Sequence, residues 1–245
     1  MFYHAISFLT GVIARLSVPI FIVQFFANSV GIKINEAEKP LSEYRSIDAF
    51  FTRGLRSELR PISETEIVSP VDGQVLEYGR ISNGKLIQAK GLFYSLESLI
   101  PLPSASDFKD GHFVTIYLSP KDCHRIFSPV SGTVLASRIV PGKVLPVREP
   151  YISGHPNLYV ENTRLITLLS SAVGKVAVVK VAALNVSSIS TECQVGASVS
   201  KGQHLATFHL GSTVVLLFEK NAMEEFSFSS THIKYGESIT RRSMQ

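Results

Sequence analysis

The chain has 245 residues, of which 45% are hydrophobic and 18% are charged, and its formal net charge at pH 7 is +4. A chain of this length can bury the core of one large domain, or of a smaller domain with an appendage. Its positive charges form no basic stripe with interleaved aromatic residues, which argues against a nucleic-acid partner and favours an anionic membrane surface. Two cysteines and seven scattered histidines make neither a disulfide framework nor a zinc motif, so we expect a reducing compartment and no metal.

The first 32 residues contain one formally charged side chain, Arg15, and the 17 residues from Leu16 to Ile32 are uncharged. A membrane-spanning helix needs about 20 apolar residues, and this run is interrupted by Pro19 and Gln24. A secretory signal would need a basic start and a small-residue cleavage site. We therefore expect helices that lie on a membrane surface, with a spanning helix or a packed core helix as the alternatives.

A polar connector follows, and Tyr44–Gly54 is predicted to form a short helix. Ser46 is a plausible N-cap, Asp48 lies in the first turn, and Gly54 would stop the helix. Three arginines then give either a solvated basic face or a surface that faces phosphates beside the membrane. These arginines are Arg53, Arg56 and Arg60.

From Ile67 onward, short apolar segments alternate with glycine and proline, which is typical of β structure. Two segments, 68–76 and 127–135, both contain Ser-Pro-Val-x-Gly-x-Val, and a third glycine-turn unit lies at 195–205. We expect an α+β chain that is mostly β, with a barrel or sandwich core built from related strand-turn units. The domains would be an N-terminal helical, membrane-associating region at 1–62 and a β-rich domain at 63–245.

The two Ser-Pro-Val units differ at the x position, where one has Asp72 and the other has Ser131. An aspartate in a turn usually serves the turn itself. Asp72 remains a candidate functional residue, because the partner unit lacks the carboxylate.

A strand predicted at 113–118 runs into Ser119-Pro120, and Asp122 lies three residues after the serine. This is a capping box with proline at the first helical position, so we expect a single helical turn. On that turn His124 and Phe127 would share one face as i,i+3 neighbours.

The rest of the chain contains a long connection, further strands and one unusual step. Residues 141–165 are predicted to form an irregular loop that faces the substrate. Strands are expected at 165–169 and 175–186, and 219–245 should hold a short strand or helix with a loose tail. The segment 206–218 is predicted to be one buried strand, interrupted by Gly211-Ser212 as a β-bulge or as a strained step that turns the serine hydroxyl onto the preceding carbonyl.

Six segments, in order along the chain, resemble the phosphatidylserine decarboxylase family. They are Phe50–Arg56 with Arg60-Pro61, Ser69–Gly73, Gln88–Gly91 with Tyr94–Leu96, Tyr117–Asp122 with His124-Arg125, Pro156–Leu158 with Asn162–Arg164, and Leu210–Thr213. The resemblance implies a proenzyme that cuts itself between Gly211 and Ser212, giving fragments 1–211 and 212–245. It also implies decarboxylation of phosphatidylserine to phosphatidylethanolamine.

The resemblance assigns roles to three residues. Ser212 would become a pyruvoyl group whose ketone forms a Schiff base with the substrate amine and accepts electrons as carbon dioxide leaves. Asp72 and Ser212 match two triad positions, and His124 would protonate the product carbanion. The implied partners are phosphatidylserine, an anionic membrane surface and the two fragments themselves, with a homodimer as a further option. The implied location is the cytoplasmic face of a bacterial inner membrane, as a peripheral protein.

One position departs from the family pattern. The family usually carries a second histidine, the triad base, three residues after the position of His124, and this chain has Phe127 there. Either His124 serves both steps or another imidazole substitutes, although along a continuous strand His209 would point away from Ser212. The alternatives are slow maturation or a catalytically inactive, lipid-binding relative. A lipoyl- or biotinyl-type carrier is disfavoured, because no lysine lies in a suitable tight hairpin.

Overall fold

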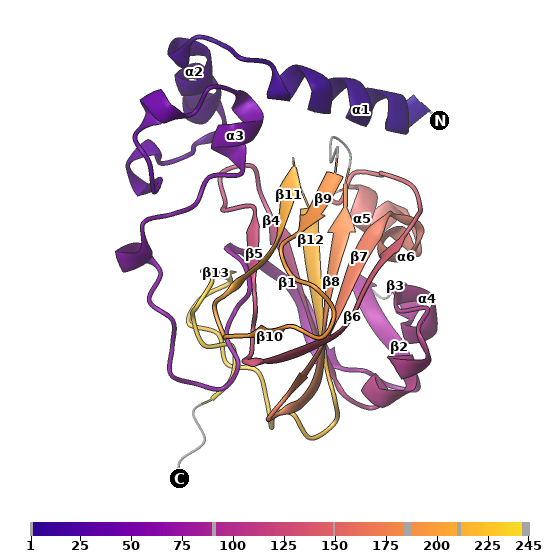
Figure 1. The fold of residues 1–245 in the computed structure, drawn as a ribbon. Helices are drawn as coiled ribbons and strands as arrows, with labels where there is room; N and C mark the ends of the chain where they lie inside the picture. Colours follow the sequence, from indigo (N-terminus) through magenta and orange to yellow (C-terminus); the bar gives the residue numbers. More distant parts are fainter. Residues whose placement is uncertain (1, 90–91, 149, 184–187, 210–211, 242–245) are drawn as a thin grey trace.

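The computed structural model describes residues 2–89, 92–148, 150–183, 188–209 and 212–241. The chain starts with helices and continues mainly as strands (Figure 1). The helices are α1 (Phe2–Arg15), α2 (Ile20–Val30), α3 (Ile47–Phe51), α4 (Leu96–Leu99), α5 (Tyr151–Gly154) and α6 (Leu158–Glu161), with 3₁₀ turns η1 (Ile34–Glu36), η2 (Leu41–Glu43), η3 (Ser57–Leu59) and η4 (Pro103–Phe108). The strands are β1 (Gly73–Arg80), β2 (Lys85–Ala89), β3 (Leu92–Ser95), β4 (His112–Leu118), β5 (Arg125–Phe127), β6 (Gly132–Val140), β7 (Arg164–Ser171), β8 (Gly174–Ala182), β9 (Ser188–Thr191), β10 (Ser198–Val199), β11 (His204–His209), β12 (Ser212–Phe218) and β13 (His232–Ile233).

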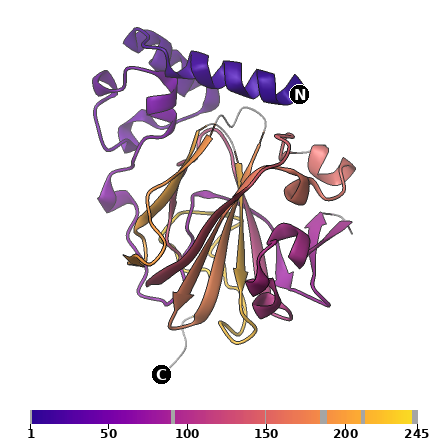
Figure 2. The ribbon, with the colours of Figure 1, turned by 45° about the vertical axis from the view of Figure 1, so that its right-hand side comes forward.

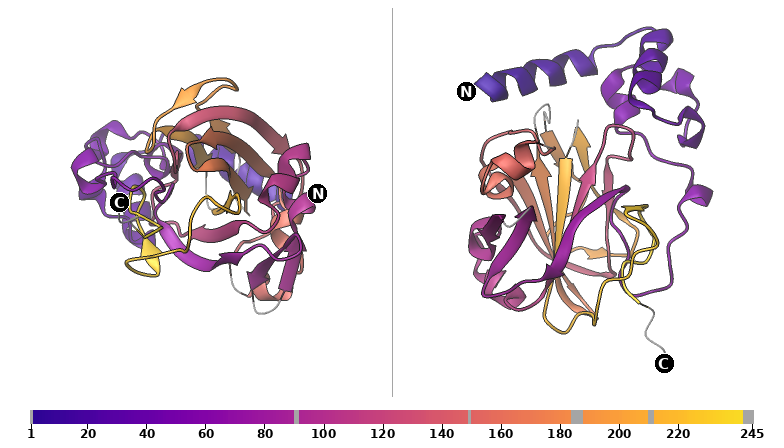
Figure 3. Two further views of the ribbon diagram at one scale, coloured as in Figure 1. Left: turned by 90° about the horizontal axis from the view of Figure 1, so that it is seen from below. Right: turned by 180° about the vertical axis from the view of Figure 1, so that it is seen from behind.

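The strands form three sheets. An eight-stranded sheet has the order β10-β6-β7-β8-β12-β4-β1-β13, a three-stranded sheet has the order β5-β11-β9, and β2 pairs with β3. The large sheet curves strongly when viewed from below (Figure 3). The expected mostly β chain with some helices is confirmed, whereas a closed barrel or a sandwich stays a prediction.

The core lies against the central strands of the large sheet. Figure 2 shows the three-stranded sheet on one side of it, and the β2-β3 hairpin with α4 on the other. Because both faces are covered, β8 and β12 are apolar along almost their whole length rather than alternating. Their buried members include Val178, Val179, Leu216 and Leu217, all with no exposed surface. This packing fixes the backbone of β12, the strand that begins at Ser212.

The N-terminal helices α1, α2 and α3 lie together at the end of the β structure where β11 ends and β12 begins (Figure 1). Within the described ranges, no helix is both long and apolar enough to cross a membrane. The predicted N-cap is confirmed, because the Ala49 N–H donates to Ser46 Oγ at 3.1 Å. The helix ends at Phe51, before the predicted stop at Gly54. After the helix, the Arg53 guanidinium donates to the Lys121 carbonyl at 2.9 Å, which ties this segment to the loop between β4 and β5.

The two Ser-Pro-Val units adopt the same turn. Ser69 Oγ donates to the Val71 carbonyl at 2.7 Å, and Ser128 Oγ donates to the Val130 carbonyl at 2.6 Å. A strand then begins at the glycine of each unit, β1 in the first and β6 in the second. The repeated motif seen in the sequence is therefore a repeated local structure.

The two units also bond to each other in a symmetric way. The Val68 N–H donates to the Pro129 carbonyl at 3.0 Å, and the Phe127 N–H donates to the Pro70 carbonyl at 2.9 Å. Val68 and Phe127 occupy equivalent places, each directly before the serine of its unit. Phe127 is thus held at the junction of the two units by its own backbone.

Several predicted strands are confirmed and one loop is corrected. β4 and β7 contain the predicted strands at 113–118 and 165–169, and β13 is the short strand expected after 219. β8 covers the predicted strand up to Ala182, and 184–187 lie outside the described residues. The connection at 141–165 is less irregular than predicted, because it contains α5 and α6 and is fastened by the Asn162 amide, which donates to the Leu145 and Ala182 carbonyls.

Candidate active site

The Gly211–Ser212 bond joins two different sheets. β11 belongs to the three-stranded sheet, whereas β12 lies in the middle of the eight-stranded sheet. The segment 206–218, predicted to be one strand interrupted at Gly211-Ser212, therefore contains two strands that pair with different neighbours, whereas the predicted bulge or strained step falls on residues outside the described ranges. Gly211 lies outside the described residues, and only the backbone of Ser212 is described.

Packing fixes the start of β12 on both sides. The Ser212 backbone pairs with Leu118 of β4 and with Ala182 of β8. Leu118 is fully buried and Ala182 is nearly so. The residue expected to be the nucleophile is thus anchored by two antiparallel neighbours at the edge of the core.

His124 directly precedes β5 in the chain and is completely buried. Its Nδ1 is 3.0 Å from the Asp122 carbonyl oxygen, which can only accept, so Nδ1 carries the proton and Nε2 has the free lone pair. Within the described part of the chain, Nε2 has no hydrogen-bond partner. Burial lowers the pKa of His124 to about 3, which keeps the imidazole neutral at physiological pH.

The helical turn predicted after Ser119 is limited to Ser119–Asp122, where the Asp122 N–H donates to the Ser119 carbonyl at 2.9 Å. The capping contacts are present, since Asp122 Oδ2 accepts from the Ser119 N–H at 2.8 Å and from its hydroxyl at 2.6 Å. However, Arg125–Phe127 forms β5, which pairs with β11. Strand pairing with a distant segment overrides the local helix signal, so His124 and Phe127 do not share a helical face.

Asp72 is buried and bonded to a buried arginine. Arg60 Nη2 lies 2.6 Å from Asp72 Oδ2, and Arg60 Nε lies 3.0 Å from Oδ1. The Tyr235 N–H also donates to Oδ1, at 2.9 Å. Burial alone would lower the pKa of Arg60, but its bonds with Asp72 and Glu36 raise it instead. The Asp72 carboxylate is therefore satisfied without a histidine, and its bonds do not reach His124.

Phe127 occupies the position at which the sequence resemblance predicts a second histidine. Its ring stacks on Tyr235, with centroids 3.9 Å apart and an angle of 18° between the planes. The ring of His204 lies on another side, at 5.7 Å between centroids. The stacking contact between Phe127 and Tyr235 thus lies where the sequence resemblance predicts an imidazole beside the Asp72 segment.

A second histidine, His209, ends β11 and carries a carboxylate partner. Its Nδ1 lies 3.0 Å from Asp48 Oδ1 and 3.1 Å from Oδ2. Both side chains are largely buried, with 19% and 12% of their surfaces exposed. The orientation argument against His209 fails, because side-chain alternation holds only along a continuous strand, and the strand is broken between His209 and Ser212.

The short helix α3 contacts both histidines. The ring centroids of Phe51 and His124 are 3.9 Å apart, and the Asp48 carboxylate binds His209. Asp48 and Phe51 are i,i+3 neighbours, so they share one face of the helix. Since the Phe208 N–H also donates to the His124 carbonyl at 2.9 Å, the two histidines belong to adjoining segments.

Lys180 is a buried residue that the sequence interpretation missed. It lies in β8 with no exposed surface, its Nζ bonds to Thr167 Oγ1, and burial lowers its pKa to about 7. A lone lysine inside the apolar run 176–183 was the signal that could have revealed it. Arg60 and Asp48 were seen only as part of a basic surface and as a first-turn residue, because their partners are distant in sequence.

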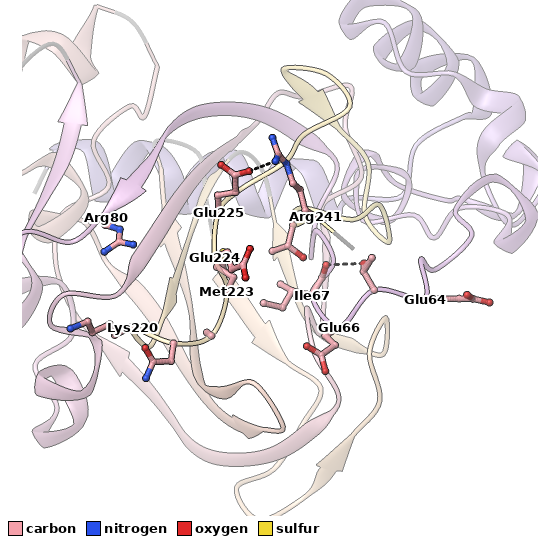
Figure 4. Close-up of a pocket in the computed structure, with 13 residues that line it drawn as sticks. Glu64, Glu66, Ile67, Arg80, Lys220, Met223, Glu224, Glu225 and Arg241 are labelled. Carbon is pink, nitrogen blue, oxygen red and sulfur yellow. Dashed lines mark hydrogen bonds and ion pairs between the residues drawn. The ribbon is translucent and has the colours of Figure 1, made fainter. Parts of the chain in front are cut away.

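The structure also contains a large cavity that is separate from these residues. It is lined by segments 64–67, 220–225 and 240–241 together with Arg80, and Figure 4 shows Glu225 paired with Arg241 at its rim. The segment 220–225 follows shortly after Phe218, the far end of β12. Because β12 has seven residues at about 3.3 Å each, the cavity lies roughly 20 Å from the start of that strand. It is not the site around Ser212.

No cluster of three or more histidine, cysteine, aspartate or glutamate side chains that could bind a metal occurs within the described ranges. The candidate residues described above are instead imidazoles, carboxylates and an arginine. Such groups can accept and donate protons and can bind anions.

Comparison with known proteins gives one consistent result. The family profile described as phosphatidylserine decarboxylase matches residues 47–241. A protein of Alcanivorax borkumensis named phosphatidylserine decarboxylase proenzyme is 38% identical over 242 residues, which covers 88% of this chain and 83% of that protein. Proteins with the same name from Myxococcus xanthus and Acinetobacter baumannii are 38% and 36% identical, covering 88% and 90% of this chain and 85% of each relative.

Proposed function

The chain belongs to the phosphatidylserine decarboxylase family, and on this premise we propose that it cuts itself and converts phosphatidylserine into phosphatidylethanolamine. The proposal rests on one observation above all. The motif Leu210–Thr213 connects β11 and β12, which belong to different sheets, and β11 carries His209 and bonds to the His124 carbonyl. The backbone reaches the geometry needed for attack most easily at glycine.

Self-cleavage begins with the Ser212 hydroxyl. Its Oγ attacks the Gly211 carbonyl carbon, the peptide C–N bond breaks, and the proton passes to the freed nitrogen, which leaves an ester. Removal of the α-proton then breaks the Cβ–O bond, releasing the Gly211 carboxylate and leaving dehydroalanine. Hydrolysis of this group, with loss of ammonia, gives a pyruvoyl cap on the fragment 212–245.

His124 fits the role of the proton carrier in decarboxylation. A pyruvoyl group supplies a ketone that binds the substrate amine and takes up the electrons left when carbon dioxide departs. The unpartnered Nε2 of His124 is a buried polar atom that such a site would satisfy. The substrate carries anionic carboxylate and phosphate groups. Their charges favour the imidazolium form, which then donates its proton to the product carbon.

Asp72 has the role of a positioning residue in this proposal. Both of its oxygens are engaged by Arg60 and by the Tyr235 main chain. It therefore acts through those groups, which hold the ring stack of Tyr235 and Phe127, rather than through a direct bond to an imidazole.

We also propose that residues 1–62 associate with a membrane surface and that 63–245 form the decarboxylase domain. Several large apolar side chains of α1 and α2 are exposed to solvent, and Phe25 is 75% exposed. On α1 they recur with the spacing of one helix face, which suits a helix lying in the plane of a membrane interface. These residues are Leu9, Val12, Ile13, Leu16, Ile20, Phe21 and Phe25.

A second candidate function is favoured by Phe127. With an aromatic ring in place of the usual triad histidine, the chain would be a catalytically inactive, lipid-binding relative on the same scaffold. The two functions differ in one covalent property, which is whether the chain is cut.

The experiment is to measure the intact mass of the purified protein. We expect two pieces, the smaller spanning 212–245 with a pyruvoyl-blocked N-terminus, together with release of carbon dioxide from phosphatidylserine. Ser212→Ala should run as one uncut chain without decarboxylation. A wild-type chain that stays whole, with an unmodified Ser212, would support the inactive relative. Activity in Ser212→Ala would exclude the pyruvoyl mechanism.

A further inference from the structure

We propose that Asp48 and His209 form the acid–base dyad that starts self-cleavage, with His209 as the base and Asp48 as its positioning residue. This inference rests on the proposed function. It assigns to this chain a base other than the histidine that the family has at the position of Phe127. It also assigns the two histidines to different reactions, with His209 acting in self-cleavage and His124 acting in decarboxylation.

The bonding of His209 sets its tautomer. A carboxylate can only accept, so Nδ1, which lies 3.0 and 3.1 Å from the two Asp48 oxygens, carries the proton. In the neutral imidazole, Nε2 then has the lone pair. An imidazole whose Nδ1–H points to a buried carboxylate is the arrangement that orients a base and stabilises the imidazolium formed when it takes a proton.

His209 lies within reach of the serine that it would activate. Three Cα–Cα steps, each about 3.8 Å, separate it from Ser212, so their Cα atoms are at most about 11 Å apart. The chain changes sheets between the two residues, so strand alternation does not force their side chains apart. The anchors on both sides are fixed, with β11 paired to β5 and β9 and β12 paired to β4 and β8.

His124 is a weaker candidate for this first step. It is completely buried, and the oxygen that accepts from its Nδ1 is the neutral carbonyl of Asp122 rather than a carboxylate. Its ring packs against Phe51, and although the charge of Asp122 favours the imidazolium form, burial and the charge of Arg53 oppose it. Burial accordingly lowers its pKa to about 3, which makes it a poor acceptor for a serine proton before substrate is present.

His209 Nε2 takes the proton of Ser212 Oγ while Oγ forms a bond with the Gly211 carbonyl carbon. The resulting imidazolium is stabilised by Asp48, and it returns the proton to the Ser212 nitrogen as the C–N bond breaks. Arg15 also contacts this dyad, with its Nε 3.6 Å from Asp48 Oδ2. It helps to hold the carboxylate in place.

The test follows cleavage of the full chain made by cell-free synthesis, with the fraction cut measured over time by gel and intact mass. We expect His209→Ala to slow cleavage at least 100-fold, the usual contribution of a general base, and Asp48→Asn to slow it at least tenfold. Added imidazole should restore cleavage in His209→Ala, which a purely structural role would not allow. His124→Gln should still cut but fail to decarboxylate phosphatidylserine.

His232→Ala is the matched control. His232 is also paired with a carboxylate, Asp122, at 2.9 Å, but it lies in β13, three strands away from β12. The His232→Ala variant should cut itself at the wild-type rate. The proposed dyad is wrong if His209→Ala, folded by its thermal melting curve, cuts at the wild-type rate, or if slow cutting in it is not rescued by imidazole. The proposed function fails separately, if the wild type itself is never cut.

Discussion

The two Ser-Pro-Val units of this chain share one turn but differ in what surrounds it. In the first unit, Asp72 accepts a bond from the Tyr235 N–H at 2.9 Å. In the second, the hydroxyl of the equivalent Ser131 accepts from the Lys201 N–H at the same distance. The turn thus needs only a side-chain oxygen at this position. The carboxylate of Asp72 goes beyond that need, because it also binds the buried Arg60.

A second contrast lies just before each unit. Phe127 stacks on Tyr235, whereas the equivalent Val68 is a fully buried aliphatic residue. Three residues earlier, Thr65 bonds through its hydroxyl to Ile67 and Ser238, whereas the equivalent His124 keeps an unpartnered Nε2. The repeated turn therefore has a structural role in both units. The candidate functional groups, Asp72 and His124, are polar side chains that the turn itself does not require.

The largest expected effect on stability comes from removing the Asp72 carboxylate. Asp72→Ala leaves the buried Arg60 without its main partner, which costs about 3–5 kcal/mol of unfolding free energy. Ser131→Ala loses one hydrogen bond, worth about 1 kcal/mol. Urea denaturation of the two variants measures the difference. Equal losses of unfolding free energy in the two variants would mean that Asp72 and Ser131 have the same structural role, which would contradict the proposed difference between the two units.

The next effect concerns His124 and pH. Its pKa is lowered by burial to about 3 in the folded chain, whereas an unfolded histidine titrates near 6.5. The unfolded chain therefore binds this proton first as pH falls. The associated stability is complete above about pH 6.5 and is lost toward pH 3, by up to about 1.4 kcal/mol per pH unit.

Urea unfolding of the wild type and His124→Gln between pH 7 and pH 5 isolates this contribution, because the other titrating groups are common to both. We expect the wild type to lose up to about 2 kcal/mol more than the variant over this interval. Parallel pH curves for the two proteins would show that His124 is not buried in its neutral form in solution.

The smallest effect is expected for Phe127→His. It exchanges a ring stacked on Tyr235 for a more polar one, at a cost of about 1 kcal/mol in stability. Because the proposed dyad already supplies a base, the cleavage rate should change less than threefold, measured by the same time course of intact mass. A rise of 100-fold would show that the family histidine was the missing part and that His209 does not replace it.

Much of the candidate site was visible in the sequence. Ser46 as an N-cap, β4 and the repeated turns follow from short-range patterns of polar and apolar residues. The family-like motifs also pointed to the start of β12. The turn predicted after Ser119 ends at Asp122 and does not bring His124 and Phe127 onto one helical face, because the pairing of β5 with β11 outweighs a local cap.

The sequence by itself determined which residues can do chemistry and where the turns fall, because these depend on residue type and on spacing over a few positions. Only the tertiary structure decided which of those residues meet. Asp48 and His209 are 161 positions apart, yet they share two short contacts, and Asp72 is bound to Arg60 rather than to a histidine. The physical reason is that strand pairing between distant segments, including the change of sheets between β11 and β12, sets the direction of each side chain.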